Sequence, residues 1–176
     1  MAEENTNGGA GAQPAPPAGD AQPTAQAQPS LKIVTQYVKD LSFENPQAPQ
    51  VLLNRGAQPK INISVGVQAN PVSGNDVEVE LKLDTRAQDG DTVVFAIELV
   101  YAGIFRLANI PKENVQALTL IECPRLIFPF ARQVVAEASR NGGFPPLLID
   151  PIDFVALYRQ QMAAAQGGQA APVANA

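Results

Sequence analysis

The sequence predicts an α+β fold in which a four-stranded antiparallel sheet is followed by a long helix and a shorter C-terminal helix. Two observations support this class. Between residues 31 and 105, apolar and polar side chains alternate with a period of two, which is typical of strands with one buried face. After Pro111 the apolar side chains recur every three to four positions, which is typical of amphipathic helices. Strands that all precede the helices indicate an α+β arrangement.

Four strands are expected in the first part of the chain. Their predicted ranges are residues 31–43, 61–68, 77–84 and 92–105. Asn70-Pro71 and Ser73-Gly74-Asn75 predict the turn between the second and third strands, because Asn, Pro, Gly and Ser favour turn conformations. Asp89-Gly90-Asp91 predicts the next turn in the same way.

The fourth predicted strand is apolar on both of its faces and is interrupted only by Glu98. A strand of this kind must be covered on both sides. A chain of 176 residues has few elements to supply that cover. We therefore expect a second subunit or a ligand to bury this strand. The residues expected at the subunit interface are Phe95, Ile97, Leu99 and Tyr101.

Three helical segments are expected after Pro111. Residues 112–122 are predicted to form a separate helical piece, and the long helix is predicted to begin near Pro129. An apolar stripe from Ile127 to Ala138 continues along this helix, which is predicted to end at Asn141-Gly142-Gly143. The last helix is expected to open at Asp150-Pro151, with Asp150 as its N-cap.

The composition divides the chain into one domain and two tails. Ala, Gly, Pro and Gln make up 21 of the first 29 residues, and such a segment cannot bury enough apolar surface to offset its ordering entropy. We predict disordered tails at residues 1–29 and 163–176 and a folded domain at residues 30–162. The sequence has neither the basic start of a secretory signal nor a run of about 18 apolar residues, so we expect a cytoplasmic protein.

The side chains exclude most catalytic chemistry. The chain has no histidine and one cysteine, which removes His-based catalysis, His-ligated metals, Cys clusters and internal disulfides. It has no Gly-rich phosphate loop, and Asp89-Gly90-Asp91 lacks the further ligands of a calcium loop. We expect no cofactor and no metal. Cys123 is interpreted as a small buried apolar residue, and a thiol enzyme centred on it remains an alternative.

The charge is acidic overall and unevenly distributed. The net charge of −5 argues against nucleic-acid binding, which usually requires a basic patch. Nine acidic and four basic side chains lie between Asp40 and Glu98. Solvated strand faces explain most of these acids, but an acidic face can also steer a basic partner. Asp40, Glu44 and Glu98 are the candidates for such a role.

Four blocks of the sequence closely resemble the SecB family of bacterial protein-export chaperones. The blocks are YVKDLSFENPQAP (37–49), YAGIFRL (101–107), CPRLIFPFAR (123–132) and GGFPPLLIDPIDFVALY (142–158). The resemblance covers most of residues 31–162. It implies a SecB-like fold of four antiparallel strands, a long helix and a shorter one. It also implies a tetramer, a dimer of dimers, with the long helices between the sheets.

The resemblance further implies an ATP-independent holdase, not an enzyme, without a cofactor or direct membrane insertion. Such a protein binds unfolded precursors and delivers them to the SecA motor ATPase. The acidic SecA-binding residues of the family fall on Asp40, Glu44 and Glu98. The sequence departs from the family pattern at Ala96, where leucine is common, and in residues 52–59, where a tryptophan is often present.

The client groove is expected around the loop after the first strand and the start of the last helix. The candidate residues are Phe43, Leu52, Leu53, Phe144 and Phe154. Apolar grooves and open strand edges can hold extended polypeptides with little regard to their sequence. One alternative function stays open beside this one, a generic oligomeric adaptor or a toxin–antitoxin-associated relative whose acidic sheet binds another basic protein.

Overall fold

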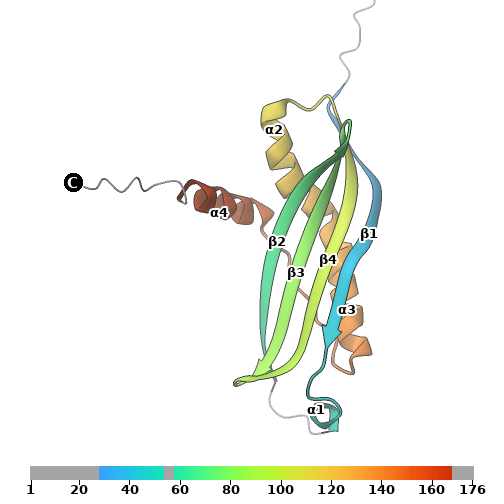
Figure 1. The fold of residues 1–176 in the computed structure, drawn as a ribbon, viewed down its shortest axis with the longest axis vertical. Coiled ribbons are helices and arrows are strands. Elements are labelled where there is room, and N and C mark those ends of the chain that lie inside the picture. Colours follow the sequence, from blue (N-terminus) through green and yellow to red (C-terminus); the bar gives the residue numbers. More distant parts are fainter. Residues whose placement is uncertain (1–27, 54–57, 168–176) are drawn as a thin grey trace, which may run out of the picture.

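The chain folds into one antiparallel sheet covered on one face by helices (Figure 1). A computed structural model describes residues 28–53 and 58–167, so residues 1–27 and 168–176 of the predicted tails lie outside the described residues. The strands follow the order β1-β4-β3-β2 across the sheet. Their bounds are Ser30–Glu44 (β1), Lys60–Ser73 (β2), Asp76–Asp89 (β3) and Thr92–Ala108 (β4). The predicted α+β class is confirmed.

The turn between β2 and β3 is shorter than predicted. Strand β2 continues through Asn70 and Pro71 to Ser73, and only Gly74 and Asn75 form the turn. Proline has no amide hydrogen to donate, but β2 is an edge strand and the pairing with β3 shifts register beside Pro71. The edge therefore accommodates a residue that a central strand would exclude. The predicted turn at Gly90-Asp91 is confirmed.

The helical segments after Pro111 form one continuous rod. Helix α2 (Lys112–Ala117) passes into a π-helical turn, η1 (Leu118–Glu122), and then into α3 (Cys123–Asn141). The prediction of a separate piece followed by a helix starting near Pro129 is wrong. Pro129 lies on the exposed side of α3, where water can satisfy the carbonyl that loses its partner.

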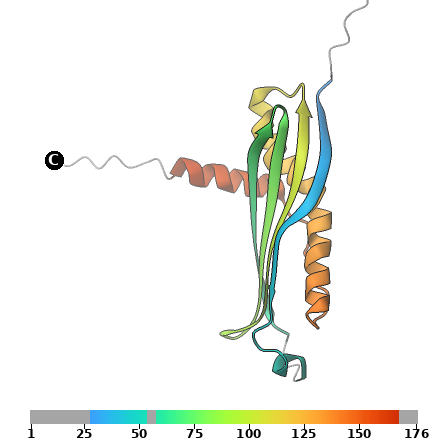
Figure 2. The ribbon, with the colours of Figure 1, turned by 45° about the vertical axis from the view of Figure 1, so that its right-hand side comes forward.

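The last helix, α4, begins later and continues further than predicted. It spans Phe154–Gly167, past the predicted domain boundary at residue 162. Its N-cap is Asp153 and not Asp150, because Asp153 Oδ1 accepts hydrogen bonds from the amides of Val155 and Ala156, both at 3.0 Å. Figure 2 shows α4 extending away from the sheet and α3.

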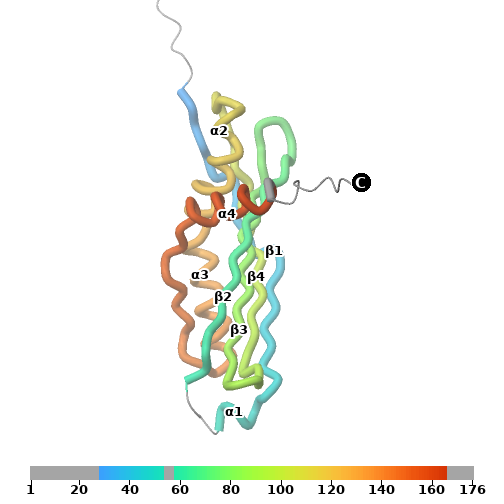
Figure 3. Tube along the Cα trace, turned by 90° about the vertical axis from the view of Figure 1, so that its left-hand side faces the viewer, coloured from blue at the N-terminus to red at the C-terminus, as the bar shows by residue number. Residues whose placement is uncertain are grey.

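The hydrophobic core lies between the sheet and α3 (Figure 3). The inner face of β4 supplies much of it, and the predicted interface residues lie there with 4%, 0%, 0% and 7% exposure, namely Phe95, Ile97, Leu99 and Tyr101. The protomer's own α3 packs on this face, and Phe95 contacts Phe43 and Phe144. Phe95, Ile97 and Leu99 therefore offer no surface to a second subunit, and the interface prediction is wrong for these three. Tyr101 borders a groove between β1 and α3, so for this residue the interface stays a prediction. Alternation alone could not show which element provides the cover.

Candidate functional site

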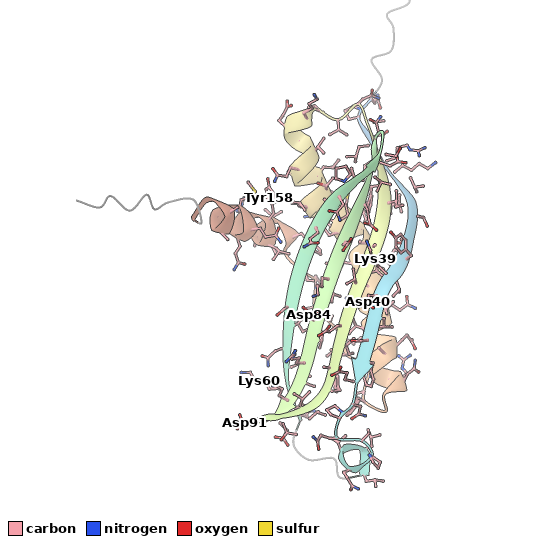
Figure 4. The ribbon with its side chains drawn as sticks, in the orientation of Figure 1. Lys39, Asp40, Lys60, Asp84, Asp91 and Tyr158 are labelled. Atoms are coloured by element: carbon pink, nitrogen blue, oxygen red, sulfur yellow. The ribbon has the colours of Figure 1, made fainter. Side chains whose placement is uncertain are left out.

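The outer face of the sheet, which α3 does not cover, brings together the three predicted acidic residues. Figure 4 shows this face and labels Asp40 on it. Asp40 and Glu44 flank Ser42 on β1, and Ser42 lies opposite Glu98 on β4. Directly opposed residues of neighbouring strands project from the same face, so these three carboxylates share one surface. All three are exposed.

Asp84 extends this surface to a third strand. It lies opposite Glu98 in the pairing of β3 with β4. We call Asp40, Glu44, Glu98 and Asp84 the acidic surface. Reading the sequence did not single out Asp84, because β3 carries several similar acids and only the register shows which of them adjoins Glu98.

Ion pairing divides the acids of the outer face into two groups. Arg106 binds both carboxylate oxygens of Asp76, at 2.7 and 2.8 Å, and Lys39 binds Glu78 and Glu80, at 3.0 and 2.7 Å. Asp84 has a longer contact with a lysine, at 3.7 Å. Within the described part of the chain, no ion pair involves Asp40, Glu44 or Glu98. The three predicted contact residues are thus among the acids that form no ion pair, and the basic residues nearest to them in the register are Lys82 and Arg86, opposite Val100 and Ala96 of β4.

A network of polar side chains crosses β4 on the outer face, beside Ala102 and therefore next to the acidic surface along the strand. The hydroxyl of Tyr37 donates a hydrogen bond to Glu78, and Lys39 donates to Glu78 and Glu80. The bond from Tyr37, together with those from Lys39, lowers the pKa of Glu78. The register places Ala102 of β4 between Tyr37 and Glu80, and Ala102 is fully buried. At Ala102, side chains of the same sheet therefore provide the outer cover that a second subunit was expected to provide.

Three aromatic side chains meet where β1, β4 and the end of α3 come together. The ring of Phe95 lies 6.1 Å from that of Phe43 and 4.7 Å from that of Phe144. A β-carbon at Gly142 would overlap the Phe43 ring. Glycine is therefore needed at this position for close packing, beyond the helix-ending role that the sequence indicates. We call Phe43, Phe95 and Phe144 the aromatic cluster.

Four of the five predicted client-binding residues lie at or near the aromatic cluster. Phe43 and Phe144 belong to it and are half-buried. Leu52 and Leu53 lie in the short helix α1 (Gln50–Leu53), where Leu52 approaches Gly143 and Leu53 is 75% exposed. Phe154 is different. It is 1% exposed and packs against Phe128 in the core, so it offers no surface to a client, and that assignment is wrong.

A further apolar groove lies between β1 and α3. It has a volume of about 330 Å³ and is lined by Leu41, Tyr101, Phe130 and Val134 among others. Leu41 and Phe130 are 44% and 43% exposed. No sequence pattern indicates this groove, because it forms between two elements that are far apart along the chain. A second groove of about 560 Å³ separates the end of β2 from α2 and η1.

Cys123 is buried in the core at the start of α3. Burial, with a smaller effect of Glu122, raises the pKa of its thiol to about 12. A thiol held neutral in this way is a poor nucleophile, which disfavours the thiol-enzyme alternative. The described residues also contain no group of three or more side chains able to hold a metal ion. Among these residues, no helix is both long and apolar enough to cross a membrane.

The raised pKa predicts how stability depends on pH. In the unfolded chain this thiol ionises near pH 8.5, whereas the folded chain keeps the proton, so stability is lost as the pH rises above about 9. Between about pH 8 and pH 10, we expect the wild type to lose about 1–2 kcal/mol more unfolding free energy than Cys123→Ala. Urea unfolding under reducing conditions measures both losses. Equal losses in the two proteins would contradict the assignment.

The structure defines the class of fold as SecB-like. Its fold matches that of the Rv1957 SecB-like chaperone of Mycobacterium tuberculosis, with a TM-score of 0.57 at 14% identity, over 69% of this chain and 87% of that one. The matched structure contains a ChAD peptide from the Rv1956 HigA1 antitoxin.

Sequence comparison then identifies the family. The family model described as preprotein translocase subunit SecB matches residues 24–165. The protein-export protein SecB of Bradyrhizobium sp. (strain BTAi1) is 54% identical over 86% of this chain and 96% of its own. That of Xanthobacter autotrophicus (strain Py2) is 56% identical over 80% of this chain and 90% of its own. The chain therefore belongs to the SecB family of protein-export chaperones.

Proposed function

We propose that this chaperone is an ATP-independent holdase of the cytosol that captures unfolded precursors and delivers them to the SecA motor ATPase. One observation carries the proposal. Phe43 lies between Ser42 and Glu44 in β1, so its ring projects from the inner face of the sheet and the carboxylate of Glu44 from the outer face. Apolar and acidic surfaces on opposite faces can bind a client and a basic motor at the same time.

The client site that we propose comprises Phe43, Leu52, Leu53 and Phe144. Half-buried aromatic rings beside an exposed leucine offer apolar contact to an extended chain without selecting its sequence. A folded precursor hides its own apolar segments and does not compete. Binding of the unfolded state alone retains slowly folding precursors and releases those that fold fast.

The SecA site that we propose is the acidic surface. Three exposed carboxylates that form no ion pair with a described residue favour a cationic partner, and binding to them should depend strongly on salt. Ala96 lies opposite Glu44 and supplies little apolar area, so charge carries more of the contact than it would with leucine at this position.

The assembly that we propose is a tetramer formed as a dimer of dimers. The groove between β1 and α3 supports self-association, since it leaves Leu41 and Phe130 exposed next to Val34 and Val38 of the same strand, which are 47% and 44% exposed. Several client sites on one tetramer would raise the affinity for a long chain through effective concentration. A mass near that of one chain at micromolar concentration, by light scattering, would contradict this assembly.

The adaptor and toxin–antitoxin alternatives have weaker support. The antitoxin peptide belongs to the Mycobacterium tuberculosis structure, which resembles this chain at 14% identity. The relatives at 54–56% identity carry the name protein-export protein. An adaptor of that kind would bind one partner and ignore denatured proteins.

The holdase function is tested by the refolding of an unrelated protein after dilution from denaturant. We expect the purified chaperone to slow refolding and suppress aggregation in the absence of nucleotide, and added folded protein not to compete. Refolding at an unchanged rate with a molar excess of chaperone would refute the proposal. Capture of both unfolded precursors and SecA from a bacterial lysate tests delivery.

Leu53→Ser tests the client site with little effect on stability, because the side chain is 75% exposed. Losing its apolar contact should weaken client capture about threefold. The matched control is Val72→Ser, a change at a 54% exposed residue in β2. Fluorescence titration with an unfolded client measures both affinities. The same loss in both variants, or in neither, would contradict the placement of the client site at α1.

A further inference from the structure

The residue next to Asp40 is a lysine, and yet the two do not pair. The pairing of β1 with β4 shifts register between Val38 and Asp40, so Lys39 is the extra residue of a β-bulge. In a regular strand, neighbouring side chains point to opposite faces. Here both Lys39 and Asp40 lie on the outer face, as Figure 4 shows, which makes an ion pair between neighbours feasible.

Two glutamates of β3 bind this lysine. The ammonium of Lys39 lies 3.0 Å from both carboxylate oxygens of Glu78 and 2.7 Å from Glu80 Oε1. Hydrogen bonds to Glu80 and Glu78 raise the pKa of Lys39, which stays charged. The hydroxyl of Tyr37 also binds Glu78 and fixes its position.

The difference in burial explains why Lys39 prefers the glutamates. The side chains of Glu78 and Glu80 are 14% and 19% exposed. Without Lys39 they would be two neighbouring, largely desolvated anions, which is costly. Asp40 is exposed, so water already solvates its charge and it gains less from a lysine.

We infer that Glu78 and Glu80 are positioning residues for the acidic surface, because they hold Lys39 away from Asp40 and so keep Asp40 free for a cationic side chain of the partner. The inference rests on the proposed function of the acidic surface. It gives a role to two acids that contact Lys39 rather than the partner. It also explains why a lysine adjoins a residue that is expected to bind a basic protein.

A double-mutant cycle tests the inference. The probe is a fluorescent peptide of alternating lysine and alanine, titrated at low ionic strength against the full chain. Four proteins are compared, namely the wild type, Lys39→Gln, Glu78→Gln/Glu80→Gln and the triple variant. The glutamate changes should weaken binding, since they remove two charges and release Lys39 toward Asp40. Removing Lys39 should strengthen binding about threefold more in the glutamate variant than in the wild type.

The ion pair of Asp76 and Arg106 provides a matched control on the same face. Its residues lie opposite each other near the far end of β3 and β4, several positions along the strands from Glu98. Asp76→Asn, Arg106→Gln and the double variant therefore change the same kinds of charge without releasing a cation beside Asp40. We expect the effects of Asp76→Asn and Arg106→Gln on the free energy of peptide binding to be additive in the double variant.

The outcomes separate the inference from the function on which it rests. Asp40→Asn in the wild type should weaken binding of the peptide, and if it does not, the proposed acidic site and the inference both fail. If Asp40→Asn weakens binding but Lys39→Gln has the same effect in both backgrounds, only the inference is overturned. Coupling at Lys39 that is absent at Arg106 supports it. Circular dichroism and thermal melting confirm that each variant is folded.

Discussion

Asp40→Lys combined with Glu98→Lys will lower the affinity for SecA at least about tenfold and leave the capture of unfolded clients unchanged. Each change removes an attraction to the basic partner and adds a repulsion, and neither acid forms an ion pair with a described residue that the change would break. Client capture is spared because the aromatic cluster projects from the opposite side of the sheet. Calorimetric titration with SecA over a series of salt concentrations measures the loss, which should shrink as salt screens the wild-type contact.

Asp91→Lys is the control for this double reversal. Asp91 is exposed in the turn between β3 and β4, away from the acidic surface (Figure 4). A reversal there changes the net charge by the same amount per residue, and it should weaken SecA binding far less. If the reversals at Asp40 and Glu98 reduced client capture and SecA binding equally, their charges would serve the structure and the proposed motor site would be wrong.

Gly103→Val will destabilise the fold by about 3 kcal/mol, as overpacking of a dense core does. Gly103 is buried in β4 beneath α3. A β-carbon there would lie 2.9 Å from Phe105 Cε2 and 3.3 Å from Ile127 Cγ2, and valine adds two further methyl groups. Phe105 and Ile127 are both fully buried and have little room to move, so α3 must shift away from the sheet.

Gly66→Val provides the comparison for Gly103. Its β-carbon would lie 3.8 Å from the nearest atom, Lys82 Cβ, which is an ordinary contact. Both glycines are in strands, so the two variants gain a similar amount of strand propensity. The difference between their unfolding free energies therefore reports the packing around Gly103. Urea unfolding measures both free energies. A difference below about 0.5 kcal/mol would mean that β4 and α3 are packed more loosely than described.

The period of two in the sequence was sufficient to predict the strands. In β3, four apolar residues alternate with polar ones, and these four apolar residues lie on the inner face of the sheet, namely Val77, Val79, Leu81 and Leu83.

The helix boundaries were harder to predict. Pro129 was expected near a helix start, but a proline on an exposed face is tolerated inside a helix, and exposure depends on what packs beside it. Asp150 and Asp153 are equally good cap residues by type, and only the hydrogen bonds distinguish them.

The acidic site was predicted from the family resemblance, and its geometry came from the register. Asp40 and Glu98 are far apart along the chain, and the pairing of β1 with β4 brings them to one face. No pattern in the sequence indicates which acids pair with bases. Lys39 adjoins Asp40 in the sequence but binds Glu78 and Glu80, because a bulge directs it across β4.

The sequence by itself determined the α+β class, the order of the strands and helices along the chain, and the absence of His-based chemistry, because these depend on residue types and local periodicity. Only the tertiary structure decided that α3 covers Ile97 and Leu99, that Phe154 lies in the core, and that three acids form no ion pair with any described residue. Burial and ion pairing are relations between distant residues. Their energies depend on which surfaces meet when the chain folds, and local sequence does not specify that.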